Sequence, residues 1–272
     1  METCGKDFPI NSGRIFLIHA FRVDERTFEG RWQTAHHFTV MKRNRFISAG
    51  GMRKCYAAEI FGFPEEFLNR ASDEWVLKDY LENVNGDRYD LCRKDVQTQA
   101  VAQTLGEIFS KKVKGIEGFG AFPRILPSFL VQQVGPPNYF TIEPKIDSSS
   151  YVKHINNDGL PEPPSLRSQL GQKCLAFSHW SLKFTGGRFL VCDVQGSEDA
   201  LTDIQIASVD KERELFGAGN LGEGGFTQFK RSHECNPYCT LLGLERFKIA
   251  SKQGSGDEYG KCGRFRKKEK LA

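Results

Sequence analysis

Short runs of apolar and β-branched residues, separated by glycine and polar turns, fill the first half of the chain. One run covers residues 15–18, and two others cover residues 38–40 and 56–61, on either side of a glycine turn at residues 49–53. Runs of this length bounded by turn residues are typical of strands, and two of them around a glycine turn are typical of a hairpin. We therefore expect a strand at the first run and a hairpin at the other two, with a glycine turn whose backbone is not covered by side chains.

A further strand is predicted at residues 75–80. Because successive side chains of a strand point to opposite faces, Val76 and Lys78 share one face, and the sheet presents a lysine. Two more strands are expected at residues 129–131 and 139–142.

A helical pattern follows Asp95, which we expect to be the N-cap. Val101, Leu105 and Ile108 recur at i, i+4 and i+7, the spacing of one face of a helix. This helix is predicted to run to about Val113 and to pack on the sheet.

The composition changes at residues 147–169, which are rich in Ser, Asn, Asp, Gly and Pro. Such a stretch is typical of a surface loop, and we expect the junction between two lobes there. After it the pattern predicts a helix around residues 166–175, a hairpin of strands at residues 180–184 and 188–194, and a helix that begins near Gly225.

The chain has 272 residues, of which 39% are hydrophobic and 26% charged, and a mean hydropathy of −0.46. This profile excludes collagen-like and wholly disordered chains, and at roughly 100–200 residues per domain it allows one large domain or two lobes around a cleft. No apolar run approaches the roughly 18 residues that span a bilayer, and no signal-peptide core is visible. We therefore expect an intracellular, cytoplasmic protein without membrane spans.

The net charge of +4 is concentrated near the end of the chain, where residues 261–270 hold six basic residues and one acid. The rest is close to neutral and lacks the basic excess that holds a phosphate backbone, so nucleic acid is not expected as a partner. Eight cysteines without a secretion signal favour free thiols or metal ligands over disulfides.

Asp193, Gln195 and Asp203 form the first candidate site. In an extended chain Asp193 and Gln195 point the same way, and a short loop after Gly196 could return Asp203 to the same place. Two carboxylates and an amide oxygen suit a magnesium ion that bridges nucleotide phosphates, but the same spacing is common among surface acids in a loop.

A run of His and Cys residues forms the second candidate site. Cys235 and Cys239 lie at i and i+4, one turn apart on a helix face, and His233 lies just before them. His179, expected at the start of a strand in apolar surroundings, is the most suitable fourth ligand of a tetrahedral zinc ion. Two buried free cysteines and a surface histidine would give the same pattern.

Gly217, Gly219 and Gly222 form a G-x-G-x-x-G pattern, but the hydrophobic strand that a dinucleotide fold requires does not precede it. A flexible loop over a substrate or phosphate and an ordinary surface loop both fit. Lys78, and Arg53 beside the glycine turn, could neutralise phosphates or extend into solvent.

In their order along the chain, these pieces resemble the alpha-kinase family of atypical protein kinases. The likeness extends over about residues 40–246 and is specific as an ordered set. The matching stretches are GMRKCYA (51–57), VLK (76–78), IEP (142–144), YVKHINN (151–157), AFSH (176–179), DVQG (193–196), LTDIQI (201–206), GNLG (219–222) and HECNPYC (233–239).

The resemblance implies an α+β, two-lobed protein-kinase-like fold with ATP between the lobes. An N-lobe of antiparallel sheet and helix would cover residues 37–146, after an N-terminal extension at residues 1–36. A mixed C-lobe with a structural zinc site would cover residues 147–250, and the basic tail at residues 251–272 is expected to be disordered.

The resemblance also implies an ATP- and magnesium-dependent serine/threonine protein kinase. Lys78 would contact the ATP phosphates, with Arg53 and Gly51 nearby, and Glu143 would belong to the hinge that meets adenine.

Two aspartates would be essential for the implied reaction. Asp193 would orient or deprotonate the hydroxyl of the protein substrate, while Gln195 and Asp203 would hold Mg²⁺. The implied ligands of the structural zinc ion are His179, His233, Cys235 and Cys239. The loop that contains Gly217, Gly219 and Gly222 would face the peptide substrate.

The sequence departs from the family pattern at Ile204, where proline is common, and at residues 145–148, which lack the usual aromatic and glycine residues. A zinc-stabilised pseudokinase or nucleotide-binding scaffold is the alternative to an active kinase. The active enzyme is favoured by the joint presence of Lys78, Asp193, Gln195 and Asp203.

Overall fold

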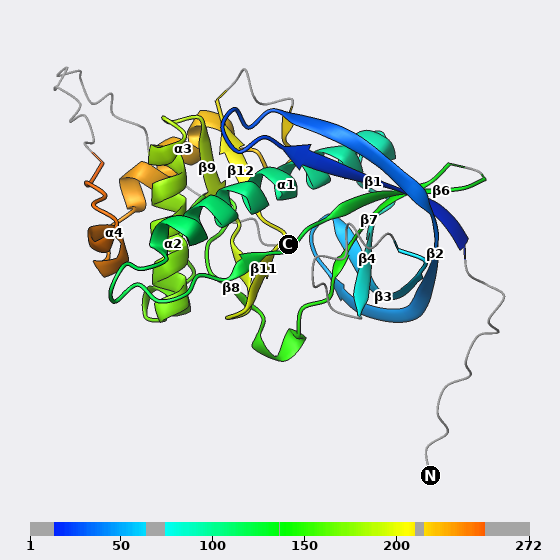
Figure 1. The fold of residues 1–272 in the computed structure, drawn as a ribbon, viewed down its shortest axis with the longest axis horizontal. Coiled ribbons are helices and arrows are strands. Elements are labelled where there is room, and N and C mark those ends of the chain that lie inside the picture. Colours follow the sequence, from blue (N-terminus) through cyan, green and yellow to red (C-terminus); the bar gives the residue numbers. More distant parts are fainter. Residues whose placement is uncertain (1–13, 64–73, 136, 210–214, 248–272) are drawn as a thin grey trace, which may run out of the picture.

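The computed structural model describes residues 14–63, 74–135, 137–209 and 215–247. Six antiparallel strands close into a barrel in the order β1-β2-β3-β4-β7-β6 (Figure 1). These strands are β1 (Arg14–Val23), β2 (Gly30–Ala49), β3 (Arg53–Phe61), β4 (Trp75–Tyr80), β6 (Phe129–Gln133) and β7 (Tyr139–Pro144). The predicted strands of the first half, and the hairpin around the glycine turn, are thereby confirmed.

The barrel begins earlier than the boundary that we expected. β1 and the start of β2 lie within residues 14–36, which we had assigned to an N-terminal extension. Alternate residues of β1, namely Phe16, Ile18 and Ala20, are buried in the barrel. The start of β2 is rich in polar residues and gives little signal, because its extended form depends on pairing with β1.

The remaining elements form a second part of the molecule beside the barrel (Figure 1). A two-stranded sheet pairs β9 (Phe189–Cys192) with β12 (Gln205–Ser208), and a four-stranded sheet has the order β5-β11-β10-β8. The other bounds are β5 (Arg124–Ile125), β8 (Val152–Lys153), β10 (Gln195–Gly196), β11 (Ala200–Thr202), α2 (Gln169–Phe184), α3 (Gly222–Ser232) and α4 (Pro237–Leu241), with short 3-10 turns at Ser148–Ser150 and Pro163–Leu166.

Helix α1 (Arg88–Val113) packs against β1, β6 and β7 of the barrel and against β5, β12 and α2 of the second part. Its N-cap is Asp87, whose side chain accepts the N–H of Asp90 at 2.9 Å. The prediction of Asp95 as N-cap was wrong, since Asp95 lies inside the helix. The first turns of α1 are mostly polar, so the apolar period becomes visible only further along.

Helix α2 replaces the helix and strand that we predicted over residues 166–184. Ser168 caps it by accepting the N–H of Gly171 at 3.0 Å. Trp180 and Phe184 lie one turn apart and stack with ring centroids 4.4 Å apart. The strand prediction at residues 180–184 and the hairpin after it were wrong, because a short apolar run next to glycines suits a strand or a helix equally.

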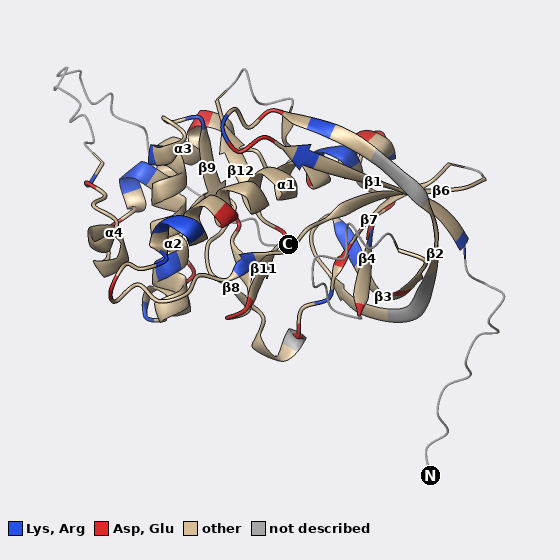
Figure 2. Cartoon of the chain, in the orientation of Figure 1, with Lys and Arg blue, Asp and Glu red and all other residues tan. Residues whose placement is uncertain are grey.

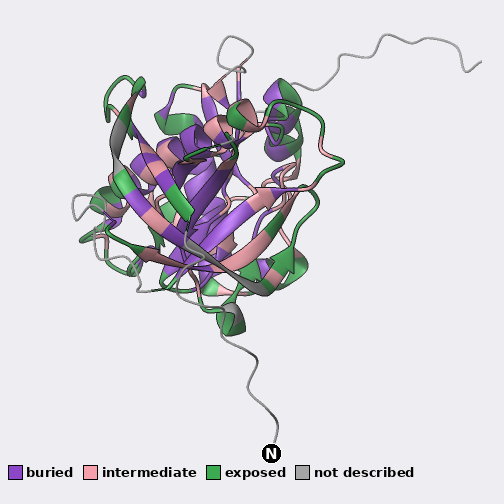
Figure 3. Ribbon diagram, turned by 90° about the vertical axis from the view of Figure 1, so that its right-hand side faces the viewer, coloured by how far each residue is buried: buried purple, intermediate pink, exposed green. Residues whose placement is uncertain are grey.

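The β1–β2 hairpin connects the two parts of the fold. At its tip, the Asp24 carboxylate accepts the N–H groups of Arg26 and Thr27, both at 2.9 Å. Phe28 has a left-handed backbone (φ 60°) and is buried, with its ring 5.8 Å from that of Phe189 in an edge-to-face contact. Phe28 therefore belongs to the core of the second part, whereas residues 24–27 of the tip are exposed. Figure 3 shows the buried residues of the molecule in purple.

Acidic and basic residues are distributed over both parts (Figure 2). Among the described helices, none combines the length and the apolar character that a bilayer crossing requires.

Candidate active site

A cavity of about 630 Å³ lies between the barrel and the second part, a size typical of small-molecule sites. The barrel contributes the β2–β3 turn with Gly51, and side chains such as Val76 on β4. The second part contributes Asn157, Thr202 and residues of β10 and β12. A side chain at Gly51 would meet no atom within 4 Å, so the turn leaves its backbone open to the cavity.

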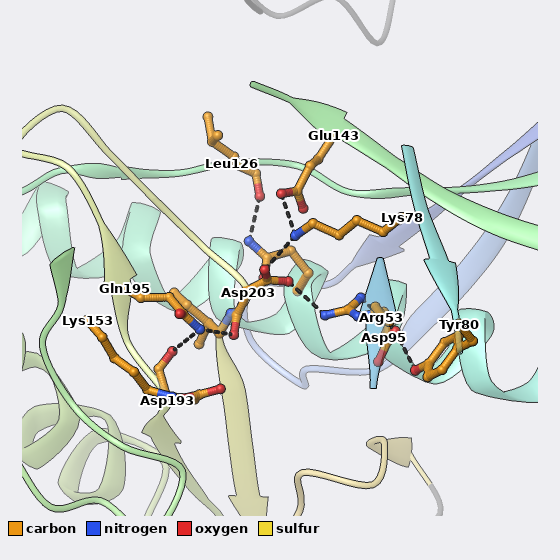
Figure 4. A network of polar contacts seen from close by, with 12 residues as sticks. Arg53, Lys78, Tyr80, Asp95, Leu126, Glu143, Lys153, Asp193, Gln195 and Asp203 are labelled. Atoms are coloured by element: carbon orange, nitrogen blue, oxygen red, sulfur yellow. Dashed lines mark hydrogen bonds and ion pairs between the residues drawn. The ribbon is translucent and has the colours of Figure 1, made fainter. Parts of the chain in front are cut away.

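Lys78 lines the cavity and links the barrel to the second part (Figure 4). Its Nζ lies 2.6 Å from Glu143 Oε1 on the neighbouring strand β7 and 2.6 Å from Asp203 Oδ2. The side chains of Lys78 and Glu143 are each 7% exposed, so the pair is held away from water. The predicted strand thus presents its lysine to a carboxylate cluster rather than to solvent.

Arg53 forms the second cationic arm of the same network. Its Nη2 lies 2.7 Å from Asp203 Oδ1, and its Nη1 lies 2.8 Å from Asp95 Oδ2 on α1. Tyr80 donates its hydroxyl to the same Asp95 oxygen at 2.7 Å. Both oxygens of Asp203 therefore have a cationic partner.

The electrostatics of the cluster follow from this arrangement. Burial opposes the charge of Asp203, but Lys78 and Arg53 outweigh it and hold the pKa of this carboxyl well below its ordinary value. Burial raises the pKa of Glu143 despite the opposing effect of Lys78. Burial likewise raises the pKa of Asp95, against the effects of Arg53 and Tyr80. Asp203 is therefore the carboxylate that is most firmly ionised.

Asp193 lies beside this network, with Oδ1 2.5 Å from Lys153 Nζ on β8. Burial raises the pKa of Asp193, and Lys153 partly offsets that effect. Asp193 and Asp203 both have left-handed backbones, with φ of 52° and 55°, a conformation that Asp tolerates better than most residues. Backbone conformations of this kind cluster at functional sites.

Gln195 joins the two aspartates through the main chain. Its Nε2 donates to the carbonyl oxygens of Asp193 and Asp203 at 3.4 and 3.3 Å. Gln99 of α1 supports the same turn by accepting the N–H of Ile204 at 3.2 Å and donating to the carbonyl of Leu126 at 2.8 Å. The structure thus brings together the three residues of the first candidate site.

A second cluster, of His and Cys side chains, lies where α2, the end of α3 and α4 meet. Its ligand atoms, from His179, His233, Cys235 and Cys239, all lie within 4.8 Å of one another. Cys235 Sγ is 3.7 Å from His179 Nδ1, and Cys239 Sγ is 3.5 Å from His233 Nε2. Zinc bonds of about 2.3 Å to sulfur and about 2.0 Å to nitrogen at tetrahedral angles place sulfur about 3.5 Å from nitrogen, so this donor set fits zinc.

The local structure around this cluster differs from the expectation. His179 lies inside helix α2, not at the start of a strand, and Cys235 precedes α4, so the two cysteines do not share a helix face. Burial lowers the pKa of His179 and of His233 to about 4, which keeps both rings neutral and able to bind a metal.

The loop of residues 215–222 borders the cavity through Gly219, whereas Gly217 lies against α1 and Gly222 begins α3. Of the three glycines that we singled out, only Gly219 therefore lines the cavity.

Sequence reasoning missed Asp95 and Lys153 as parts of the site. Asp95 was assigned to a helix cap, and its side chain instead holds Arg53. Lys153 lies within the stretch used for the family resemblance, but its contact with Asp193 depends on the pairing of β8 with β10.

Comparison with known proteins places these features in one family. The model of the alpha-kinase family matches residues 48–239, which include the ion network and all four residues of the His/Cys cluster. The chain belongs to the alpha-kinase family. This alpha-kinase chain is 35% identical over 178 residues to alpha-protein kinase 2 of Mus musculus, an alignment that covers 64% of the chain and 8% of that relative. It is 30% identical over 212 residues to transient receptor potential cation channel subfamily M member 7 of Rattus norvegicus, with 73% and 11% covered.

Solved alpha-kinase structures have the same fold. The apoenzyme alpha-kinase domain of myosin-II heavy chain kinase A superposes with a TM-score of 0.66 at 22% identity, covering 86% of this chain and 98% of that domain. The complex of that kinase domain with ADP gives a TM-score of 0.65 at 23% identity over 86% and 98%. The predicted α+β fold with an antiparallel sheet is confirmed. The chain spans about a tenth of the length of the curated relatives it matches.

Proposed function

We propose that this alpha-kinase chain transfers the γ-phosphate of ATP to a serine or threonine hydroxyl of a protein substrate, with Mg²⁺. One observation carries the proposal: Lys78, Arg53 and two aspartates converge on a nucleotide-sized cavity in a member of this family. Phosphoryl transfer asks the protein mainly to position the reactants and to stabilise negative charge, and this cluster holds groups suited to both.

Lys78 and Arg53 are the groups that would bind the phosphates of ATP. Lys78 is buried and Arg53 is half-buried, the present partners of both are carboxylates, and phosphate oxygens are equivalent anionic partners. The apolar side chains of Val76 and Ile146 line the cavity and would contact the adenine ring. Glu143 lies opposite Val76 in the pair of strands β4 and β7.

Asp193 is the group that would orient the substrate hydroxyl or accept its proton. Its raised pKa brings a carboxylate closer to the range in which it acts as a base near neutral pH. Lys153 holds it in place from β8.

Gln195 and Asp203 would hold Mg²⁺. Gln195 turns its amide nitrogen toward two main-chain carbonyls, so that its oxygen stays available, and Asp203 is firmly ionised. Such hard oxygen donors suit magnesium, which when bound neutralises charge that develops on the transferred phosphate. The His/Cys cluster would hold a structural zinc ion that connects α2 with α3 and α4.

The test is transfer of labelled phosphate from Mg-ATP to a generic basic protein. The wild type is compared with Asp193→Ala, Asp203→Ala and, as a matched control, Asp199→Ala, an exposed aspartate in the same part of the chain. We expect the first two variants to lose about 100-fold or more of the activity, and the control to keep it.

Equal activity in all four proteins would contradict the assignment of the two aspartates. A folded, zinc-loaded wild type that transfers no phosphate to a panel of proteins would contradict the kinase proposal and favour the nucleotide-binding scaffold.

A further inference from the structure

Tyr80 ends strand β4 and is buried, with 7% of its surface exposed. It follows Lys78 by two residues, so the two side chains lie on the same face of the strand. In the pairing of β3 with β4, Tyr80 lies directly opposite Arg53. The strand register therefore places this tyrosine beside both cations of the ion network.

The Tyr80 hydroxyl holds the carboxylate that pairs with Arg53 (Figure 4). It donates to Asp95 Oδ2 at 2.7 Å, and Arg53 Nη1 lies 2.8 Å from the same oxygen. Burial raises the pKa of Tyr80, so the phenol keeps its proton and acts as the donor. A short hydrogen bond to an ionised acceptor is directional, and it therefore fixes the orientation of the Asp95 carboxylate.

The ring of Tyr80 is itself held in place. The guanidinium carbons of Arg53 and Arg88 lie 5.8 and 5.6 Å from its centroid, within the range of cation–π contacts. The ring also belongs to a core cluster that contains Cys92 and Val96 of α1. Because the ring has little freedom to move, its hydroxyl is a rigid contact for Asp95.

The two carboxylate partners of Arg53 have different roles in the proposed reaction. Asp203 would hold Mg²⁺, so that its pair with Arg53 is given up, whereas no step of the reaction uses Asp95. Arg53 then depends on Asp95 for its position at the cavity. Ordering a long side chain costs conformational entropy, so a guanidinium that is already anchored binds phosphate better than a mobile one.

We propose that Tyr80 is a positioning residue for the phosphates of ATP, which acts by holding Asp95 and, through it, the guanidinium of Arg53. The proposal rests on the proposed function, in which Arg53 binds phosphate. Loss of the Tyr80 hydroxyl is therefore expected to weaken the binding of ATP and to leave the binding of adenosine unchanged, because adenosine carries no phosphate.

A double-mutant cycle tests this role. Tyr80→Phe removes the hydroxyl and keeps the ring, and it is studied alone and together with Arg53→Met. Tyr139→Phe is the matched control, because Tyr139 packs against the same core cluster but places its ring 5.2 Å from that of Tyr89. Isothermal titration calorimetry gives the Kd of each protein for Mg-ATP and for adenosine.

The expected result is a loss of affinity that depends on both phosphate and Arg53. Tyr80→Phe raises the Kd for Mg-ATP about fivefold, the scale of one lost hydrogen bond, and changes the Kd for adenosine less than about twofold. In the Arg53→Met background the same change alters the Kd for Mg-ATP less than about twofold, because Tyr80 acts through Arg53. Tyr139→Phe changes neither Kd.

Asp95→Asn provides a second route if Tyr80→Phe does not fold. It keeps an oxygen for the Tyr80 hydroxyl but loses the charge that holds Arg53, so the same pattern of Kd values is expected, with a larger rise for Mg-ATP.

Three results overturn the positioning role while the phosphate site stands: no rise in the Kd for Mg-ATP, an equal rise for Mg-ATP and adenosine, or the same rise with and without Arg53. If Arg53→Met binds Mg-ATP as tightly as the wild type, the assignment of Arg53 to phosphate fails and the role of Tyr80 fails with it. A folded wild type that binds no Mg-ATP overturns both the positioning role and the proposed function.

Discussion

Replacement of Lys78 by methionine tests whether the ion network holds the two parts of the fold together. Lys78 is the shared partner of Glu143 and Asp203, and its removal leaves Glu143 as a buried carboxylate without its cation. Loss of one partner of a buried pair costs about 3–5 kcal/mol. For Lys78→Met we expect a loss of about 3 kcal/mol in the free energy of unfolding near pH 8, at the lower end of this range. The reason is that the Asp203 side chain is 27% exposed and retains its ion pair with Arg53.

The cost should depend on pH in a defined direction. Burial already raises the pKa of Glu143, and without Lys78 the pKa rises further, so the folded variant binds a proton that the unfolded chain releases. A raised folded-state pKa means that stability falls as pH rises from the unfolded pKa to the folded one. The loss in Lys78→Met should therefore be smaller at about pH 5.5 than at about pH 8.

Urea unfolding followed by tryptophan fluorescence measures both effects. Lys145→Met is the matched control, since Lys145 pairs with Glu74 at 2.7 Å on the surface, where the two side chains are 29% and 70% exposed. Its loss should cost less than about 1 kcal/mol. The double variant Lys78→Met/Glu143→Gln should recover part of the stability. Equal losses in Lys78→Met and Lys145→Met at both pH values would refute the reasoning.

Three other perturbations have defined outcomes. Lys153→Met removes the cation that lowers the pKa of Asp193, so the acid limb of the kcat profile should move to higher pH; an unmoved limb would show that Asp193 is not the titrating group. Phe28→Ala should destabilise the fold by about 3 kcal/mol in urea unfolding, because the ring lies in the core of the second part, and a loss below about 1 kcal/mol would contradict that anchoring role. Cys239→Ser should reduce bound zinc, measured by elemental analysis, from about one ion per chain to well below one and lower the Tm; a zinc content equal to the wild type would argue against the proposed ligand set.

The strands of the barrel could be predicted from the sequence where apolar runs end at clear turn residues. The start of β2 could not, because polar residues before Phe38 become a strand only through pairing with β1. The end of α2 could not be predicted either, for a different reason. Its apolar run next to Gly186 is short and has no period that distinguishes a strand from a helix.

The candidate site was predictable as a set of residues but not as a set of contacts. The sequence order suggested Asp193, Gln195 and Asp203 together. Lys78 and Arg53 were candidates for neutralising phosphates, and the resemblance favoured that role over extension into solvent. Asp95 could not be recognised, because an aspartate before a helical pattern suits a cap as well as an ion pair. Its role depends on the helix beginning two turns earlier, which places the carboxylate against Arg53.

The most direct test of the central claim is a single-turnover measurement of phosphate transfer from Mg-ATP, with enzyme in excess over a basic protein substrate and the phosphorylated residue identified by mass spectrometry. The wild type should form phosphoserine or phosphothreonine in one exponential phase, Asp199→Asn should match it, and Asp193→Asn should be slower by about 100-fold or more. Equal rates for Asp193→Asn and the wild type, or no phosphorylated substrate from a folded wild type that binds ATP, would contradict the account.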